Sequence, residues 1–77
     1  MQNIEMLDIV ALVEDLPEQE LFRGQVGTVV EIHTTPGYFE VEFSGKDAIP
    51  YAMLALHESQ LLKLIHEPLT DRREWGN

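Results

Sequence analysis

The side chains best suited to chemistry are the histidines and serines, and their positions argue against a reactive centre. His33, His57 and His66 are irregularly spaced and match no short metal-ligand motif. The chain has no cysteine, and Ser44 and Ser59 lack the sequence context of a nucleophile elbow. Ser59 lies two residues after His57, a spacing at which neighbours on a helix do not face each other. We expect no metal, no cofactor and no enzymatic activity.

Two glycines form a GxxG pattern that superficially suggests a phosphate-binding loop. Gly24 and Gly27 are not followed by the lysine and helix that such a loop requires. The pattern therefore indicates structural glycines. Gly27 lies within an apolar run typical of a strand, which predicts a bulge or a close backbone approach.

The charge balance limits the kinds of partner. Among 77 residues, 14 acidic side chains face five Lys and Arg, giving a net charge of −9 and a pI near 4.5. Nucleic-acid affinity depends largely on Lys and Arg displacing counterions, and anionic membranes also attract basic surfaces. We expect no nucleic acid and no membrane as a ligand, and a basic protein as any charge-steered partner.

The acidic residues gather in two places, which we predict to bind that partner. Four fall in a long first loop, and two alternate with an aromatic residue on the outward face of a strand; the set is Glu14, Asp15, Glu18, Glu20, Tyr38, Glu40 and Glu42. A ring beside carboxylates offers an apolar anchor and charge together. The alternative is that these acids form a solvated surface that keeps a small protein soluble.

Short apolar runs bounded by turn residues predict a mainly β protein. We expect strands over residues 8–13, 26–33, 38–43, 51–56 and 61–64, a helical turn over 57–60, and a turn in the first loop capped by Asp15. The competing interpretation is one helix over residues 50–66, which is rich in helix-forming residues. Closure of five strands into a small barrel removes exposed edges. The expected core comprises Val10, Leu12, Val26, Val30, Ile32, Phe39, Val41, Phe43, Leu54, Leu56 and Leu62.

The organisation of the chain is that of one domain with a tail. We expect the domain to span residues 1–65 and the tail residues 66–77, where Pro68 interrupts the apolar pattern. The longest uncharged apolar-rich stretch falls far short of the ~20 residues of a spanning helix. The N-terminus lacks the positive region of a signal peptide, so a cytoplasmic protein is expected.

Three segments resemble a known family. LDIVALVEDLPEQELFRGQVGTVVEI, YFEVEFSG and YAMLALHESQLLKL are similar to domain of unknown function 4926, a family of short bacterial proteins. The resemblance implies a five-stranded SH3-like barrel and assigns no activity or functional residue. The function we expect is a non-enzymatic protein-binding module, such as an antitoxin or immunity-like protein that binds a basic effector. An accessory or regulatory subunit of a larger enzyme is the alternative, and an RNA-binding barrel is disfavoured by charge.

Overall fold

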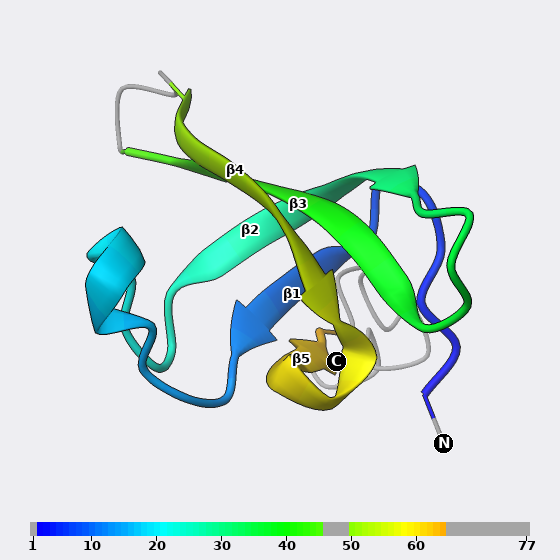
Figure 1. Cartoon of the computed structure of the whole chain (residues 1–77), viewed down its shortest axis with the longest axis horizontal. Helices are drawn as coiled ribbons and strands as arrows, with labels where there is room; N and C mark the ends of the chain where they lie inside the picture. Colours follow the sequence, from blue (N-terminus) through cyan, green and yellow to red (C-terminus); the bar gives the residue numbers. More distant parts are fainter. Residues whose placement is uncertain (1, 46–49, 65–77) are drawn as a thin grey trace, which may run out of the picture.

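The computed structural model describes residues 2–45 and 50–64 and contains five strands and two short 3-10 turns (Figure 1). In chain order they are β1 (Ile9–Leu12), η1 (Pro17–Gln19), β2 (Val26–Ile32), β3 (Tyr38–Ser44), β4 (Pro50–His57), η2 (Glu58–Gln60) and β5 (Leu61–Lys63). Each predicted strand is present, and so is the helical turn before the last one. The helical alternative for residues 50–66 is wrong over its described part, residues 50–64.

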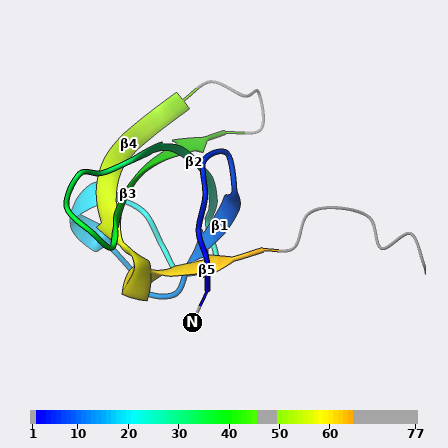
Figure 2. The same cartoon turned by 90° about the vertical axis from the view of Figure 1, so that its right-hand side faces the viewer.

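The five strands form one antiparallel sheet in the order β4-β3-β2-β1-β5. Figure 2 shows this sheet curling around a common interior. The predicted mainly β fold with five strands is confirmed. Within the described residues, the edge strands β4 and β5 are not paired with each other, so the sheet is curled and open. The short β5 pairs with β1 alone.

The core lies on the inner face of this curled sheet. β3 alternates as its sequence predicts: Phe39, Val41 and Phe43 are buried. Six predicted core residues are confirmed as buried, namely Val10, Leu12, Phe39, Val41, Phe43 and Leu56. Leu54 is partly buried and packs against them.

The predicted inner face of β2 is wrong. Val26 and Ile32 are about half exposed and Val30 is only partly buried, whereas Val29 is fully buried. Val29 lies opposite Val41 on the inner face, so the prediction exchanged the two faces at the start of the strand. A bulge follows between Val29 and Glu31, and beyond it Ile32 lies opposite Phe39 but stays half exposed. Gly27 also faces inward, directly opposite Phe43.

Besides Val29, three buried core residues were not predicted, and one more predicted core residue, Leu62, is exposed. Leu61 is buried and Leu62 is exposed, a shift of one residue that reverses the predicted face of β5. Ile4 precedes the first strand and closes one side of the core. Leu21 is fully buried in the core, and its bridge to Leu16 closes the first loop around η1.

The predicted boundary between the domain and its tail depends on residues outside this description. Residues 65–77 are not described, so the boundary of the tail at residue 66 stays a prediction. Among the residues that are described, no helix has the length and apolar character needed to cross a membrane.

Candidate functional site

The outer face of the β3–β4 hairpin carries three of the predicted site residues. Tyr38, Glu40 and Glu42 alternate with the buried residues of β3 and therefore point away from the core. Their partners in register on β4 are His57, Ala55 and Met53, respectively. Directly opposed residues of an antiparallel pair share one face. The result is an outer surface on which carboxylates of β3 lie beside His57, Ala55 and Met53 of β4.

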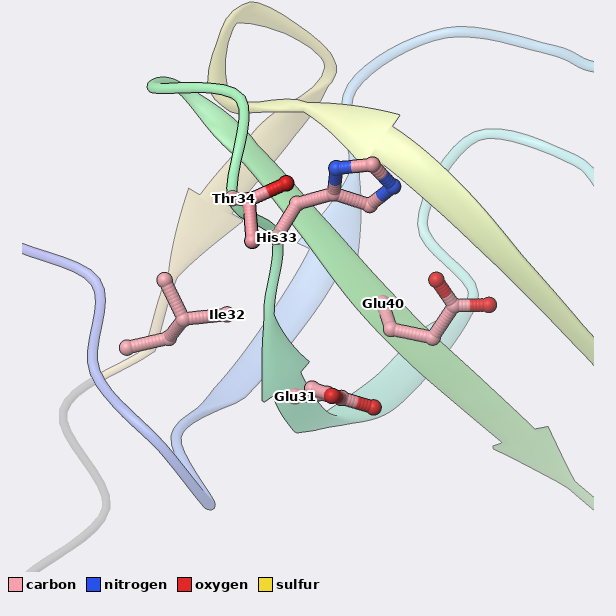
Figure 3. A pocket seen from close by; sticks show the side chains of 5 residues that line it. All are labelled: Glu31, Ile32, His33, Thr34 and Glu40. Carbon is pink, nitrogen blue, oxygen red and sulfur yellow. The ribbon is translucent and has the colours of Figure 1, made fainter.

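The bulge in β2 brings a further carboxylate to this surface. Glu31 lies directly opposite Glu40, and the two line a hollow of about 250 Å³ with Ile32, His33 and Thr34. Figure 3 shows Glu31, His33 and Glu40 extending to one side of the β2–β3 hairpin and Ile32 to the other. Opposed like charges on a sheet are destabilising, and a cation placed between them relieves their repulsion. The outward position of Glu31 was predictable, but its pairing with Glu40 follows from the bulge.

Tyr38 lies between two imidazole rings at the start of β3, next to the β2–β3 turn. Its ring makes edge contacts with His33 and His57, at centroid distances of 6.3 and 5.0 Å. His57 in turn lies over Gly37, where an added methyl group would come within 3.1 Å of His57 Nε2. Tyr38 remains 39% exposed. The phenol ring is therefore held in place by its neighbours while part of it still faces solvent, a combination suited to an anchor for a partner.

The expectation that His57 and Ser59 do not face each other is wrong. His57 Nδ1 lies 2.9 Å from Ser59 Oγ and accepts the Ser59 backbone N–H at 3.1 Å. The reason is that His57 is the N-cap of η2 and has extended backbone angles, so the helical-spacing argument does not apply to it. Gln60 completes this capping box by accepting the His57 backbone N–H. The contact therefore has a structural role as a cap.

Two acids of the first loop are engaged within the chain. Asp15 accepts the backbone N–H of Arg23 at 2.9 Å, and so it ties the two ends of the loop together. It does not cap η1, whose N-cap is Leu16 without a side-chain bond, so that prediction is wrong. Glu14 accepts a hydrogen bond from the Gln60 side chain at 3.0 Å. Asp15 thus holds the loop itself, and Glu14 links the loop to η2.

The remaining loop acids lie apart from the hairpin surface. Glu18 is in η1 and Glu20 ends it in a left-handed conformation, with φ of 59°. Figure 1 shows η1 and the β2–β3 turn at opposite ends of the sheet. The remaining predicted site residues therefore divide into two groups: Glu18 and Glu20 at η1, and Tyr38, Glu40 and Glu42 on β3. We call Glu31, Tyr38, Glu40 and Glu42 the hairpin acidic surface.

Basic side chains are scarce in the described part of the chain. Arg23 and Lys63 are its two cations, and its one recorded ion pair joins Lys63 Nζ to Asp8 at 3.2 Å. The Glu5 backbone N–H and then Lys63 hold the pKa of Asp8 below its usual value. The acids of the hairpin acidic surface have no such cation among the described residues. No cluster of three His, Asp or Glu suited to a metal ion occurs there either, and His66 lies outside that part.

Comparison with known proteins identifies a family and nothing closer. The family described as Domain of unknown function (DUF4926) matches residues 6–63. No curated protein and no solved structure matches the chain.

Proposed function

The chain belongs to the DUF4926 family, which has no assigned activity, and we propose from its own surface that it is a protein-binding module for a basic partner. The observation that carries this proposal is the hairpin acidic surface. It combines three carboxylates, two of them directly opposed, with a fixed and partly exposed tyrosine. Such a surface complements Lys and Arg side chains placed around an apolar contact.

The negative net charge of the chain favours a protein over the other classes of ligand. A net charge of −9 repels phosphate backbones, so RNA binding is disfavoured. A basic protein surface instead gains from long-range attraction, which mainly raises the rate of association. Tyrosine and arginine are the residue types most enriched in binding hot spots, so an Arg of the partner stacked on Tyr38 is the contact we expect at the centre.

Two biological forms of this function are compatible with the proposal. One is an antitoxin or immunity-like protein that covers a basic effector, such as a nuclease. The other is an accessory or regulatory subunit of a larger enzyme. Both are non-enzymatic, and we propose the cytoplasm as the place of action. The identity of the partner distinguishes them: a free-standing toxic enzyme indicates the first form, and a multisubunit enzyme the second.

The test begins with native co-purification from the host, followed by binding measurements on the two purified proteins. We expect the double variant Glu40→Gln/Glu42→Gln to bind the partner at least ~tenfold more weakly, because hydrogen bonds to charged groups are each worth roughly 1.5–3 kcal/mol. The matched control is Glu18→Gln/Glu20→Gln, which removes the same charge at η1. If the control loses as much affinity as the hairpin variant, only net charge matters and the proposed surface is wrong.

A further inference from the structure

The strand β4 forms one edge of the sheet and contains no Lys, Arg, Asp or Glu. Its sequence is PYAMLALH; Met53 on its outer face and Tyr51 are each more than half accessible. Natural edge strands are usually protected by lysines, internal prolines, bulges or a covering segment. Residues 51–56 of β4 have neither a lysine nor a proline. Pro50 and a register irregularity affect the start of the strand, but from Ala52 to His57 the β4 edge is not paired with any other strand within the described residues.

Hydrogen bonds at the end of the hairpin reveal which backbone groups point outward. The His57 N–H bonds to the Gln60 side chain, and the Tyr38 carbonyl accepts from the His33 N–H on the other side of β3. The opposed pair Tyr38 and His57 is therefore not hydrogen-bonded between β3 and β4. Such pairs alternate with hydrogen-bonded ones along an antiparallel ladder.

This alternation assigns the outward groups of β4. Counting back from His57, the residues Ala55 and Met53 direct both N–H and C=O away from β3, whereas Leu56 and Leu54 bond to it. The register is regular from His57 to Ala52, so the count holds over this stretch. Within residues 2–45 and 50–64, no hydrogen bond to the backbone of Met53 or Ala55 is recorded. Two donors and two acceptors thus line the edge.

We propose that the partner docks by adding a strand to β4, as an extended segment in which basic and apolar residues alternate. The inference rests on the proposed function, because charge complementarity with the hairpin acidic surface selects the occupant. Partner residues directly opposite Met53 and Ala55 have their side chains on the same outer face. Those residues also make the backbone hydrogen bonds with the edge.

The outer face determines the basic positions of that segment. An added strand lies about 5 Å from β4 and about 10 Å from β3. Ala55 has a short side chain and lies between the added strand and Glu40, while Met53 lies between it and Glu42. Lys and Arg stems pack along apolar surface while their charged ends reach past it. Basic residues opposite Met53 and Ala55 therefore extend over β4 to the two carboxylates.

The inner side determines the apolar positions. Ala52 and Leu54 pack against the core but remain partly accessible at the edge. The partner residues between the basic ones face these side chains, so Val, Ile or Leu there extends the core. Alternating basic and β-branched residues also favour an extended conformation, which lowers the cost of ordering the segment.

The experiment uses a capped synthetic peptide, Lys-Val-Lys-Val-Lys-Val-Lys, added to the ¹⁵N-labelled full chain. Binding is followed by amide chemical shifts and hydrogen exchange. We expect exchange at the Met53 and Ala55 amides to slow by at least ~tenfold on saturation, because both become hydrogen-bonded. Two peptides form a matched pair: N-methylation of the third residue, a Lys, removes a donor that faces β4, and N-methylation of the fourth residue, a Val, removes one that faces away. The first is expected to bind at least ~tenfold more weakly than the second.

The outcomes separate this inference from the proposed function. Equal affinity of the two methylated peptides, or no binding of the unmethylated peptide at millimolar concentration, overturns strand addition. If strand addition is overturned but the co-purified partner binds Glu40→Gln/Glu42→Gln more weakly than wild type, the proposed function is still supported.

A variant of the protein tests the same edge. Ala55→Pro removes an outward N–H that β3 does not use, and proline is tolerated on edge strands at such positions; Ala55→Val is the control that retains it. We expect the proline variant to lose peptide binding and the valine variant to keep it. Binding by a folded Ala55→Pro protein at the original affinity overturns the proposal. A dimer of the free chain that dissociates on Ala55→Pro overturns it too, because the occupant is then a second copy.

Discussion

Gly27 is the position where the packing of the core is most sharply testable. It faces inward on β2, opposite Phe43. A methyl group built there lies 2.8 Å from Val41 Cγ1 and 2.9 Å from both the Glu42 carbonyl oxygen and Phe43 Cδ1. Ordinary contacts between carbon atoms are about 3.5–4.0 Å. The Glu42 oxygen belongs to the backbone of the neighbouring strand, so Gly27→Ala forces the sheet itself to move.

The expected loss of stability follows from two opposing effects. Overpacking of a well-packed core costs about 1–3 kcal/mol. Replacing glycine by alanine within a strand recovers roughly 0.5–1 kcal/mol through chain entropy. The net expectation for Gly27→Ala is a destabilisation of about 1–2 kcal/mol, which in a domain of this size lowers Tm by roughly 5–15 °C.

The assay is chemical denaturation of four proteins: wild type, Gly27→Ala, Phe43→Leu and the double variant. Phe43→Leu shrinks one of the contacted side chains, so we expect the double variant to be more stable than additivity predicts by at least ~0.5 kcal/mol. Gly24→Ala is the control. Gly24 has φ of 94° and open space around it, so its cost comes from backbone strain and is additive with Phe43→Leu. An unchanged stability of Gly27→Ala, or strict additivity with Phe43→Leu, refutes the inward placement of Gly27.

Three more predictions concern the core, the charges and the cap. Phe43→Ala is expected to cost about 3–5 kcal/mol and the exposed Val26→Ala under about 0.5 kcal/mol in urea denaturation; similar costs contradict the assigned faces of the sheet. The pKa of Asp8 is lower in the folded protein than its unfolded value of 3.8, so the charged carboxylate stabilises the fold fully at pH values above 3.8. This contribution is lost as the pH falls through the lower folded pKa. The stability difference between wild type and Asp8→Asn, measured at several pH values, should therefore shrink below pH 3.8, and a constant difference rejects the stabilisation of the Asp8 carboxylate by the Glu5 N–H and Lys63. His57→Ala is expected to lose about 1 kcal/mol by removing the cap of η2, whereas His57→Asn keeps a capping acceptor; equal losses argue against the cap.

The fold was largely predictable because local patterns agree with it. The alternation at Phe39, Val41 and Phe43 fixes the inner face of β3, and turn residues mark the ends of most strands. The face of β2 was not predictable in the same way. Val26, Val30 and Ile32 look like a core face, but pairing with β3 turns Gly27 and Val29 inward instead, and the bulge after Val29 then places Ile32 opposite Phe39 while leaving it half exposed. Gly27 gave the one local signal, since a glycine within the strand predicted a bulge or a close backbone approach, and the structure shows the approach to β3.

The candidate site was predictable only in part for a related reason. Sequence alternation places Tyr38, Glu40 and Glu42 outward, but it cannot say which other segments come beside them. The contacts of Tyr38 with two histidines, and of Glu40 with Glu31, depend on tertiary register. Proximity in sequence likewise grouped the loop acids into one cluster. The structure separates them, because Glu14 and Asp15 are used to hold the loop.

The measurement that tests the central claim most directly is the salt dependence of the association rate with the co-purified partner. Attraction between the hairpin acidic surface and a basic partner predicts a wild-type rate that falls steeply as ionic strength rises from about 0.01 to 0.5 M. Glu40→Gln/Glu42→Gln should lower the rate at low salt and flatten its salt dependence, and Glu18→Gln/Glu20→Gln should leave a steeper dependence than the hairpin variant. Rates of wild type and Glu40→Gln/Glu42→Gln that coincide over the whole range contradict the claim.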